Sequence, residues 1–447
     1  MPRETLGSHW GQTVNVSAHK SAGSDRESMA PFSGLYRTRS VLAPMVRSGQ
    51  LPLRLLALRQ GAGLVYSEEL VDRKVQQAKR VVNATLQTID YVAQGRCIFR
   101  TCSEEKGKVI LQLGSADPEL AVGAARVVAD DVAGIDLNMG CPAPFSTHSG
   151  MGSGLLKTLD LACDILKTLV VDMHPRGVAV TAKVRILESM EDTVDMLRRL
   201  EATGIDAIAV HFRMTDERPR VPARLAWLPE LVKAVAIPVL ANGDMWTRAD
   251  IDRVLRDGAA SAMVARGALK NTSVHGSVDV PFREMLRQFT WLAIQYDMPL
   301  GYYKYTVDRM IGENLDQFTQ SERCIFQRAD HFQVAAHQVG ITEEQYRSIC
   351  DNLSYPWYID DAHIKAYGTK KLKKAKAKEI EDEAAIGRPL PEGKTPALHP
   401  PPPPAAAAED EAAPSSGKRA AENADDAPAT KQARVDAPQT PAEVPGL

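Results

Sequence analysis

The feature that most constrains the fold is a series of short, continuous apolar runs between residues 39 and 270. The runs are rich in β-branched residues and lack polar alternation, which is typical of parallel strands buried on both faces. Helical patterns separate them; for example, Val194, Leu197 and Leu200 recur at helical spacing. In chain order the runs begin at Val41, Leu64, Val109, Gly134, Val178, Ala207, Ile237 and Ser261. The chain therefore alternates strand and helix.

About eight strand–helix units in about 230 residues match a (β/α)8 barrel in size and rhythm. A doubly wound sheet is the alternative, and it normally carries G-x-G-x-x-G directly after its first strand. Here the first run ends in Ala43-Pro44-Met45, and the glycine cluster at 150–154 does not directly follow a strand. We therefore predict an α/β fold, a TIM barrel followed by a small all-α domain.

The composition divides the chain into four segments. Residues 1–35 are polar and without periodicity, so we predict a disordered leader before a barrel over 36–275. Residues 280–368 show amphipathic helical patterns with mixed aromatic and basic side chains, which serve either the core or an RNA-binding face. Residues 369–447 are charged and rich in Pro and Ala, with too little apolar area to offset the ordering entropy. We predict a helical domain over 280–368 and a disordered tail over 369–447.

The whole-chain composition excludes several classes of protein. No run approaches the roughly 18 apolar residues of a membrane helix, so we expect no membrane partner. The irregularly spaced cysteines do not form a disulfide scaffold, and Cys97 and Cys102 lack nearby partner ligands, so we expect no metal. A cytoplasmic or nuclear location follows, and basic spots between Lys418 and Arg434 are either a nuclear signal or a chance pair. The net charge of −2 does not exclude nucleic acid, because the acidic tail offsets basic residues elsewhere.

Polar residues follow the apolar runs at their carboxyl ends, where the active sites of (β/α)8 barrels lie. The first run ends at Pro44, Met45 and Val46. The residues at the ends of later runs are Gln112, Asn138, Cys141, Lys183, Arg185, His211, Arg213, Asn242, Asp244 and Arg266. Any one of them alone is explained by a structural role. Because all occupy the same end of their units, we expect them to converge on one mouth.

The last two units carry the residues of a phosphate site. Asn242-Gly243-Asp244 and Ala265-Arg266-Gly267 follow the seventh and eighth runs, where barrels commonly bind phosphate through loop amides and a helix start. Glycine at 243 and 267 lets the backbone approach a ligand closely. The pattern predicts a cofactor or substrate that bears a phosphate.

One cysteine differs from the others in its setting. Cys141 lies between Gly140 and Pro142, which predict a sharp loop that presents the sulfur at the barrel mouth. A thiol with an ordinary pKa of about 8.5 is mostly protonated at neutral pH. Cys141 is therefore able to donate a proton as readily as to act as a nucleophile.

These motifs together resemble the flavin-dependent tRNA-dihydrouridine synthases. They are APMVR at 43–47, LVYSEEL at 64–70 and NMGCP at 138–142, while FRTC at 99–102 and ERP at 217–219 resemble the eukaryotic branch that modifies position 20 of the D loop. The resemblance spans about residues 39–271 and continues more loosely through the helical region. It implies an FMN-binding barrel, NADPH as reductant and tRNA as partner, and we expect a monomer.

The resemblance also implies roles for single residues. The expected FMN contacts are Pro44, Met45, Val46, Gln112, Lys183 and His211, and those at its phosphate end are Asn242, Gly243, Asp244, Ala265 and Arg266. Asn138 and Arg185 match residues expected near the target uracil. The chain departs from the family pattern at Phe212 and Asp244, where glycine is expected.

The implied reaction reduces the C5=C6 bond of a uridine in tRNA. Reduced FMN supplies hydride to C6, and Cys141 protonates C5 from the opposite side as the general acid. Lys183 and His211 are expected to stabilise the anionic flavin and the developing oxyanion. Two alternatives stay open: an FMN oxidoreductase that acts on a free pyrimidine, and a tRNA-binding protein without catalysis.

Overall fold

The structure is a computed structural model that describes residues 30–329 and 332–352, which belong to one compact unit. The predicted tail over 369–447, with its basic spots at 418–434, lies outside the described residues. So do residues 1–29 of the predicted leader and residues 353–368 of the predicted helical domain.

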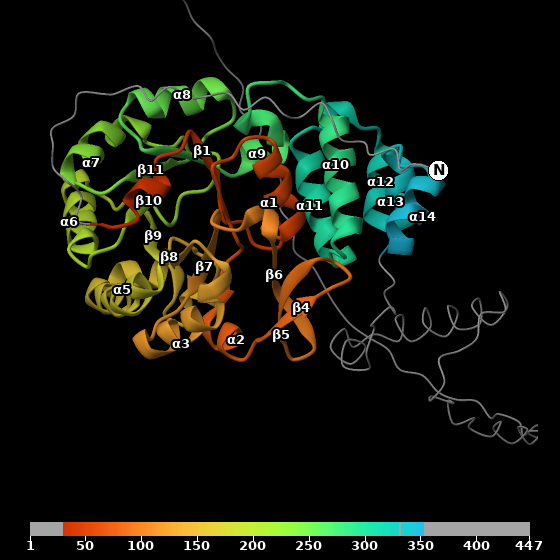
Figure 1. The fold of residues 1–447 in the computed structure, drawn as a ribbon. Helices are drawn as coiled ribbons and strands as arrows, with labels where there is room; N and C mark the ends of the chain where they lie inside the picture. The colour runs from red at the N-terminus through yellow and green to blue at the C-terminus, as the bar shows by residue number, and fades with distance from the viewer. Residues whose placement is uncertain (1–29, 330–331, 353–447) are drawn as a thin grey trace, which may run out of the picture. The chain divides into compact units, whose positions relative to one another are not determined.

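Parallel strands close into a ring, which confirms the predicted (β/α)8 barrel (Figure 1). The pairing of β2 with β7 completes the circle. The strands are β1 (Ser40–Leu42), β2 (Leu64–Tyr66), β7 (Val109–Gly114), β8 (Gly134–Met139), β9 (Ala179–Arg185), β10 (Ala207–His211), β11 (Val239–Asn242) and β12 (Ser261–Val264). The short strand β3 (Leu70–Val71) also pairs with β7. All of the predicted apolar runs therefore form barrel strands.

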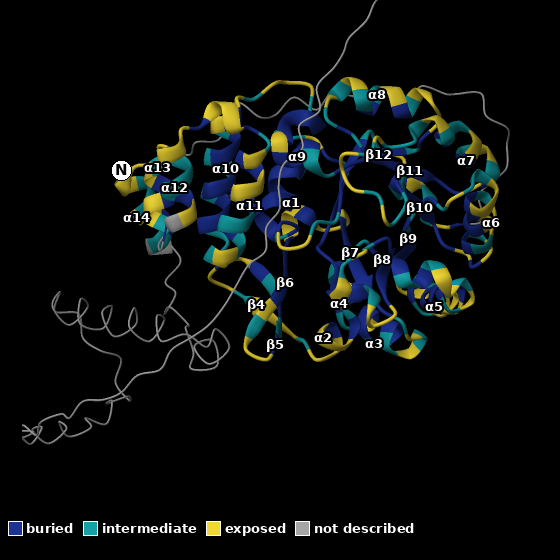
Figure 2. Ribbon diagram, turned by 180° about the vertical axis from the view of Figure 1, so that it is seen from behind, coloured by how far each residue is buried: buried dark blue, intermediate teal, exposed yellow. Residues whose placement is uncertain are grey.

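Helices surround the ring, and those that no other helix covers expose their outer faces to solvent (Figure 2). They are α1 (Leu51–Arg59), α2 (Asp72–Gln76), α3 (Pro118–Val128), α4 (Pro144–Thr147), α5 (Leu159–Met173), α6 (Met190–Glu201), α7 (Leu228–Ala234), α8 (Arg248–Arg256) and α9 (Arg266–Lys270). The local sequence explains α6: the Ser189 hydroxyl accepts the Asp192 N–H at 3.0 Å as an N-cap. Leu197 and Leu200 are then buried on its inner face.

Short 3₁₀ helices occupy several of the connections. They are η1 (Ser33–Tyr36), η2 (Ser103–Glu105), η3 (Ala129–Asp131), η4 (Gly152–Lys157), η5 (His174–Arg176), η6 (Leu225–Trp227), η7 (Thr272–His275) and η8 (Leu315–Gln317). The glycine cluster at 150–154 therefore spans the end of a loop and the start of the short helix η4.

The amino-terminal end of the barrel is closed by the residues that precede β1. Tyr36 is fully buried in the interior cluster, beside residues such as Tyr66 and Met263. The Phe32 N–H donates to the Asp206 carboxylate at 3.0 Å, next to the start of β10. Residues 30–35 were expected in the disordered leader, but they pack on the barrel because their apolar side chains fill its open end. The leader thus ends earlier than the sequence pattern predicted.

A three-stranded antiparallel sheet precedes β7, and the sequence pattern did not predict it. Its strands are β4 (Lys79–Asn83), β5 (Thr88–Ala93) and β6 (Arg96–Cys102). Gln94 and Gly95 join β5 to β6 with φ angles of 52° and 72°, the left-handed conformation that tight hairpins require. The FRTC motif at 99–102 therefore lies on β6 of this small sheet.

The described residues of the predicted helical domain form helices and contain no strand. The helices are α10 (Phe282–Gln295), α11 (Leu300–Gly312), α12 (Gln320–Arg328), α13 (Phe332–Gln338) and α14 (Glu343–Asn352). α10 packs against α1, and α11 packs against α9 (Figure 1). The Phe289 and Tyr303 rings stack with their centroids 5.8 Å apart, so Tyr303 serves the core.

Arg100 of the FRTC motif joins the small sheet to the helical region. Its Nε and one terminal nitrogen each donate to the Asp90 carboxylate at 2.7 Å. Its other terminal nitrogen donates to the backbone oxygens of Tyr296 and Asp297, just after α10. Both members of the ion pair are buried. Arg100 therefore satisfies a buried carboxylate and two carbonyl groups at once.

Replacing Arg100 with Ala should lower the free energy of unfolding by about 3–5 kcal/mol, because it leaves Asp90 buried without its partner. The exposed pair of Arg347 with Glu343 is the matched control, and Arg347→Ala should cost less than about 1 kcal/mol. Urea unfolding followed by circular dichroism measures both. Equal small effects would contradict the assigned role of Arg100.

Candidate active site

An open pocket of about 510 Å³, part of it open to solvent, lies at the carboxyl ends of β9 to β12. The predicted site residues that line it are Arg185, His211, Asn242, Gly243, Asp244, Ala265 and Arg266. The rest of the lining comprises Arg213 and Gly267, which the sequence pattern also placed at the mouth, and Glu217, Pro219, Met245, Trp246 and Met263, which it did not place there.

Strand register explains why these side chains meet. Arg185 of β9 is level with His211 of β10, which is level with Asn242 of β11. Ala209 and Leu240, two residues before His211 and Asn242, lie in the interior cluster. Because residues i and i+2 share one face of a strand, the polar residues also project into the barrel. These polar residues form the uppermost layer of side chains in the barrel interior.

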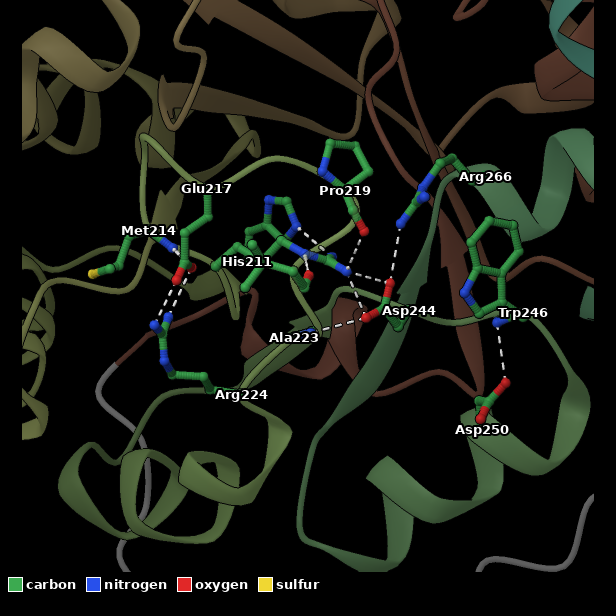
Figure 3. Close-up of polar contacts among 12 residues, drawn as sticks. His211, Met214, Glu217, Pro219, Ala223, Arg224, Asp244, Trp246, Asp250 and Arg266 are labelled. Atoms are coloured by element: carbon green, nitrogen blue, oxygen red, sulfur yellow. Dashed lines mark hydrogen bonds and ion pairs between the residues drawn. The ribbon is translucent and has the colours of Figure 1, made fainter. Parts of the chain in front are cut away.

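Asp244 lies between Arg213 and Arg266 in this pocket, and Figure 3 shows its contact with Arg266. Its carboxylate accepts two hydrogen bonds of 2.6 Å from Arg213 and one of 3.0 Å from Arg266. Burial acts to raise the Asp244 pKa, but the Arg213 hydrogen bonds and the two positive charges outweigh it and lower the pKa. Asp244 is therefore an anion that fixes the direction of two guanidinium groups.

This pairing changes the role that the family resemblance implied for Asp244. A carboxylate repels a phosphate, so Asp244 contributes to an anion site only by holding Arg266. Its φ of 53° explains why glycine suits this position, since few side chains accept a left-handed backbone. Phe212, the other departure from glycine, is fully buried in the main hydrophobic core.

The remaining residues of this end form a cradle for an anion. A Cβ atom at Gly267 would lie 2.1 Å from the Met245 carbonyl oxygen, and one at Gly243 would lie 2.9 Å from the Ala223 Cβ. Only glycine fits at these two points. The Arg266 guanidinium lies 4.5 Å above the Trp246 ring and is one-third exposed, so it is able to meet a ligand.

His211 is neutral in this setting. Desolvation lowers its pKa to about 2, and the charges of Lys183, Arg185 and two further arginines act in the same direction. Its Nε2 faces the Arg213 guanidinium at 3.5 Å. Desolvation also lowers the pKa of Lys183 to about 8, so its amine is mostly charged at neutral pH. Lys183 supplies a positive charge here, whereas His211 supplies only a neutral ring.

The Cys141 loop is held by the two residues expected near the uracil. The Asn138 side-chain oxygen accepts the N–H groups of Gly140 and Cys141 at 2.9 and 3.1 Å. The Arg185 Nε donates to the Gly140 carbonyl at 2.7 Å. Arg185 also lines the pocket, so it connects the Cys141 loop to the anion cradle.

The Cys141 thiol holds its proton at neutral pH. Desolvation raises its pKa to about 11, and the charge of Glu69 contributes in the same direction. The thiol is half-buried and free of any disulfide. These are the properties of a general acid, because a thiolate has no proton to give.

The other predicted residues follow strands of the same barrel mouth but do not line the pocket. They are Pro44, Met45 and Val46 after β1, Gln112 on β7, Asn138 and Cys141 at β8, and Lys183 on β9. Gln112 donates to the buried Asp136 carboxylate at 2.9 Å, so its amide N–H is already engaged. The sequence pattern placed Arg213 at the mouth without assigning it a role, and it assigned no role to Glu69.

The described residues lack two further features. They contain no cluster of His, Cys, Asp or Glu side chains suited to a metal ion. None of their helices has the length and apolar character that a membrane span requires.

The fold and the site define a barrel enzyme with an anion cradle and a protonated thiol at one mouth. The family described as "Dihydrouridine synthase (Dus)" matches residues 41–354. The chain therefore belongs to the dihydrouridine synthase family, which confirms the resemblance of its motifs.

Two yeast proteins are similar over most of the chain. The "tRNA-dihydrouridine(20) synthase [NAD(P)+]" of Schizosaccharomyces pombe is 37% identical over 71% of this chain and 68% of its own length. The protein of the same name from Saccharomyces cerevisiae is 37% identical over 65% of this chain and 81% of its own. A Homo sapiens "tRNA-dihydrouridine(20a/20b) synthase [NAD(P)+]-like" protein is 29% identical over 58% and 77%.

Asp244→Asn should destabilise the fold by about 1–3 kcal/mol, because Arg213 is buried and loses its ion pair; the estimate allows for the partial exposure of Asp244. Asn still tolerates the left-handed backbone, so the change isolates the charge. Asp160, which pairs with Arg199 at the surface, supplies the control Asp160→Asn. Thermal unfolding measures both, and an unchanged Asp244→Asn midpoint would refute the proposed anchoring.

Proposed function

We propose that this chain is an FMN-dependent, NADPH-using tRNA-dihydrouridine synthase that reduces uridine 20 of the D loop. The observation that carries the proposal is a protonated Cys141 thiol at the barrel mouth, linked through Arg185 to an anion cradle. The family membership and the names of the two yeast relatives support the reaction and the position.

The residues at the mouth fit FMN. Arg266, with the side-chain-free backbone at Gly243 and Gly267, suits its phosphate. The Asn242 amide donates to the Met263 carbonyl at 2.9 Å, which leaves its oxygen for a ligand N–H. Lys183 suits an anionic ring system. When bound and reduced, FMN supplies the hydride that the reaction consumes, and NADPH restores the reduced form.

Residues of the chain itself are proposed to stabilise the developing negative charge and to donate the proton. The C5=C6 bond of uracil is conjugated to the C4 carbonyl, so negative charge develops on that oxygen during reduction. The Lys183 ammonium is available to stabilise this charge in a partly dehydrated site, where such interactions are strong. The Cys141 thiol then transfers its proton to C5. Asn138 and Arg185 hold the loop that carries the thiol.

The surface between the barrel mouth and the helical region, around Arg47, Tyr305 and Arg309, suits the tRNA backbone. Arg47, just after β1, and Arg309 of α11 both lie over the Tyr305 ring, at 5.3 and 5.1 Å from its centroid. Both arginines are exposed. Exposed guanidinium groups bind phosphates, and the target base must leave its stack to reach the barrel.

Cys141→Ala should keep FMN and tRNA binding but lower turnover by about 10²–10⁴-fold, the usual contribution of general acid catalysis. Mass spectrometry of dihydrouridine formed in an unmodified tRNA transcript measures the loss. Cys163→Ala, a buried cysteine on α5, is the control and should remain active. Near wild-type turnover by Cys141→Ala would eliminate Cys141 as the acid.

Arg266→Ala should weaken FMN binding by about 10–100-fold, because one charge-assisted hydrogen bond to the phosphate contributes about 1.5–3 kcal/mol. Arg253→Ala on α8 removes an exposed arginine of the same region as a control. Fluorescence titration of the apoprotein with FMN measures both variants. Equal affinities would place the phosphate elsewhere.

A purified protein tests the proposal against both alternatives. The proposal requires a yellow protein with a flavin spectrum that reduces uridine in tRNA at the expense of NADPH. A colourless protein that binds tRNA without turnover would favour the non-catalytic alternative. Reduction of free uracil or oxidation of dihydroorotate, without action on tRNA, would favour the free-pyrimidine enzyme.

A further inference from the structure

Two consecutive carboxylates after β2 lie beside different loops of the barrel mouth. The Glu68 carboxylate accepts the backbone N–H of Arg47 at 2.6 Å and so supports the loop after β1. The Glu69 carboxylate accepts the Ser146 hydroxyl at 2.9 Å and so supports the loop after β8, which carries Cys141. The proposed reaction assigns no role to either residue.

Glu69 is held firmly in place. Its side chain is 8% exposed. A Cβ atom at Gly114, at the end of β7, would lie 2.7 Å from Glu69 Oε1, so only glycine leaves room for the carboxylate there. The same applies to Gly152, where a Cβ atom would lie 2.4 Å from the Ser146 hydroxyl and 3.1 Å from Cys141 Cβ. The carboxylate, the hydroxyl and the thiol-bearing residue are thus tightly packed.

One oxygen of this carboxylate is left without a conventional partner. Glu69 Oε2 is buried and makes no hydrogen bond of standard geometry within the described part of the chain. The polar groups beside the carboxylate, apart from Ser146, are the Cys141 thiol and the Asn138 side chain. Burial raises the Glu69 pKa, and the Cys141 thiol and the Asn138 side chain are the groups beside Ser146 that offset it. A buried carboxylate is costly unless such donors meet it, so its retention next to the thiol calls for a functional reason.

We propose that Glu69 is a positioning residue for Cys141, which holds the thiol-bearing loop through Ser146 and keeps the proton on sulfur until the substrate carbon takes it. The inference rests on the proposed function. In the step, the S–H bond of Cys141 breaks and a C5–H bond forms, which leaves a thiolate. Repulsion between this thiolate and the Glu69 carboxylate then favours uptake of a proton from water, which restores the thiol.

The charges around the sulfur support this role. Lys183 and Arg185 on β9 are cations that favour the thiolate, and the Ala143 N–H and Ser146 hydroxyl favour it as well. Desolvation and the Glu69 carboxylate oppose them and raise the Cys141 pKa. Desolvation is the larger of these two effects, and Glu69 adds the negative charge that opposes the two neighbouring cations.

Alkylation of Cys141 by iodoacetamide as a function of pH tests the proposal in the full chain. Mass spectrometry of the tryptic peptide spanning residues 127–157 isolates the signal, because this peptide contains no other cysteine. Glu69→Gln keeps the size of the side chain and removes the charge. It should shift the alkylation midpoint down by about one pH unit, which is about a tenfold faster reaction at pH 8.

Three further variants separate charge from packing. Glu69→Asp keeps the charge and should keep a midpoint near that of the unmodified chain. Ser146→Ala removes the loop contact but not the charge and should not lower the midpoint. Gly114→Ala leaves the Glu69 carboxylate charged but pushes it out of its position, so it should also lower the midpoint. This variant keeps the proposal testable if Glu69→Gln does not fold.

An unchanged or raised midpoint in folded Glu69→Gln, or a fall of equal size in Glu69→Asp, would overturn the proposal. Alkylation needs no turnover, so its result is independent of whether the chain reduces tRNA. A lowered midpoint together with near wild-type turnover by Cys141→Ala would refute the proposed role of Cys141 as the acid and leave the effect of Glu69 on the thiol standing.

Discussion

The alternation of side chains along a closed ring of parallel strands is the constraint on which this site depends. Interior residues such as Ala209 and Leu240 fill the barrel, and the residues two positions later therefore face the same way. His211 and Asn242 project into the mouth for that reason alone. The side-chain alternation of the core thus continues to the mouth. The uppermost layer of the barrel interior holds polar residues where the layers below hold mostly apolar ones.

The electrostatic balance of this layer determines what its residues are able to do. Several cations share a partly dehydrated space, so His211 stays neutral while Lys183 keeps most of its charge. Asp244 fixes two arginines on one side of the mouth. On the other side, desolvation and Glu69 keep Cys141 protonated. The mouth combines a place for an anion with a proton donor, as reduction of a uracil ring requires.

The barrel and much of its pocket lining could be predicted because both follow from local sequence. Continuous apolar runs define buried strands, and the polar residue that ends each run marks the mouth. The small sheet of β4 to β6 escaped prediction because β4 is mostly exposed and lacks an apolar run. The pairing of Asp244 with Arg213 and the contact of Glu69 with Ser146 join residues 31 and 77 positions apart, and no local pattern encodes such contacts.

Mapping of dihydrouridine in tRNA from a strain that lacks this protein tests the central claim most directly. Mass spectrometry locates each dihydrouridine by its gain of two hydrogens over uridine. The account predicts loss of the modification at position 20 alone, restored by the unmodified chain but not by Cys141→Ala. An unchanged dihydrouridine at position 20, or its restoration by Cys141→Ala, would contradict it.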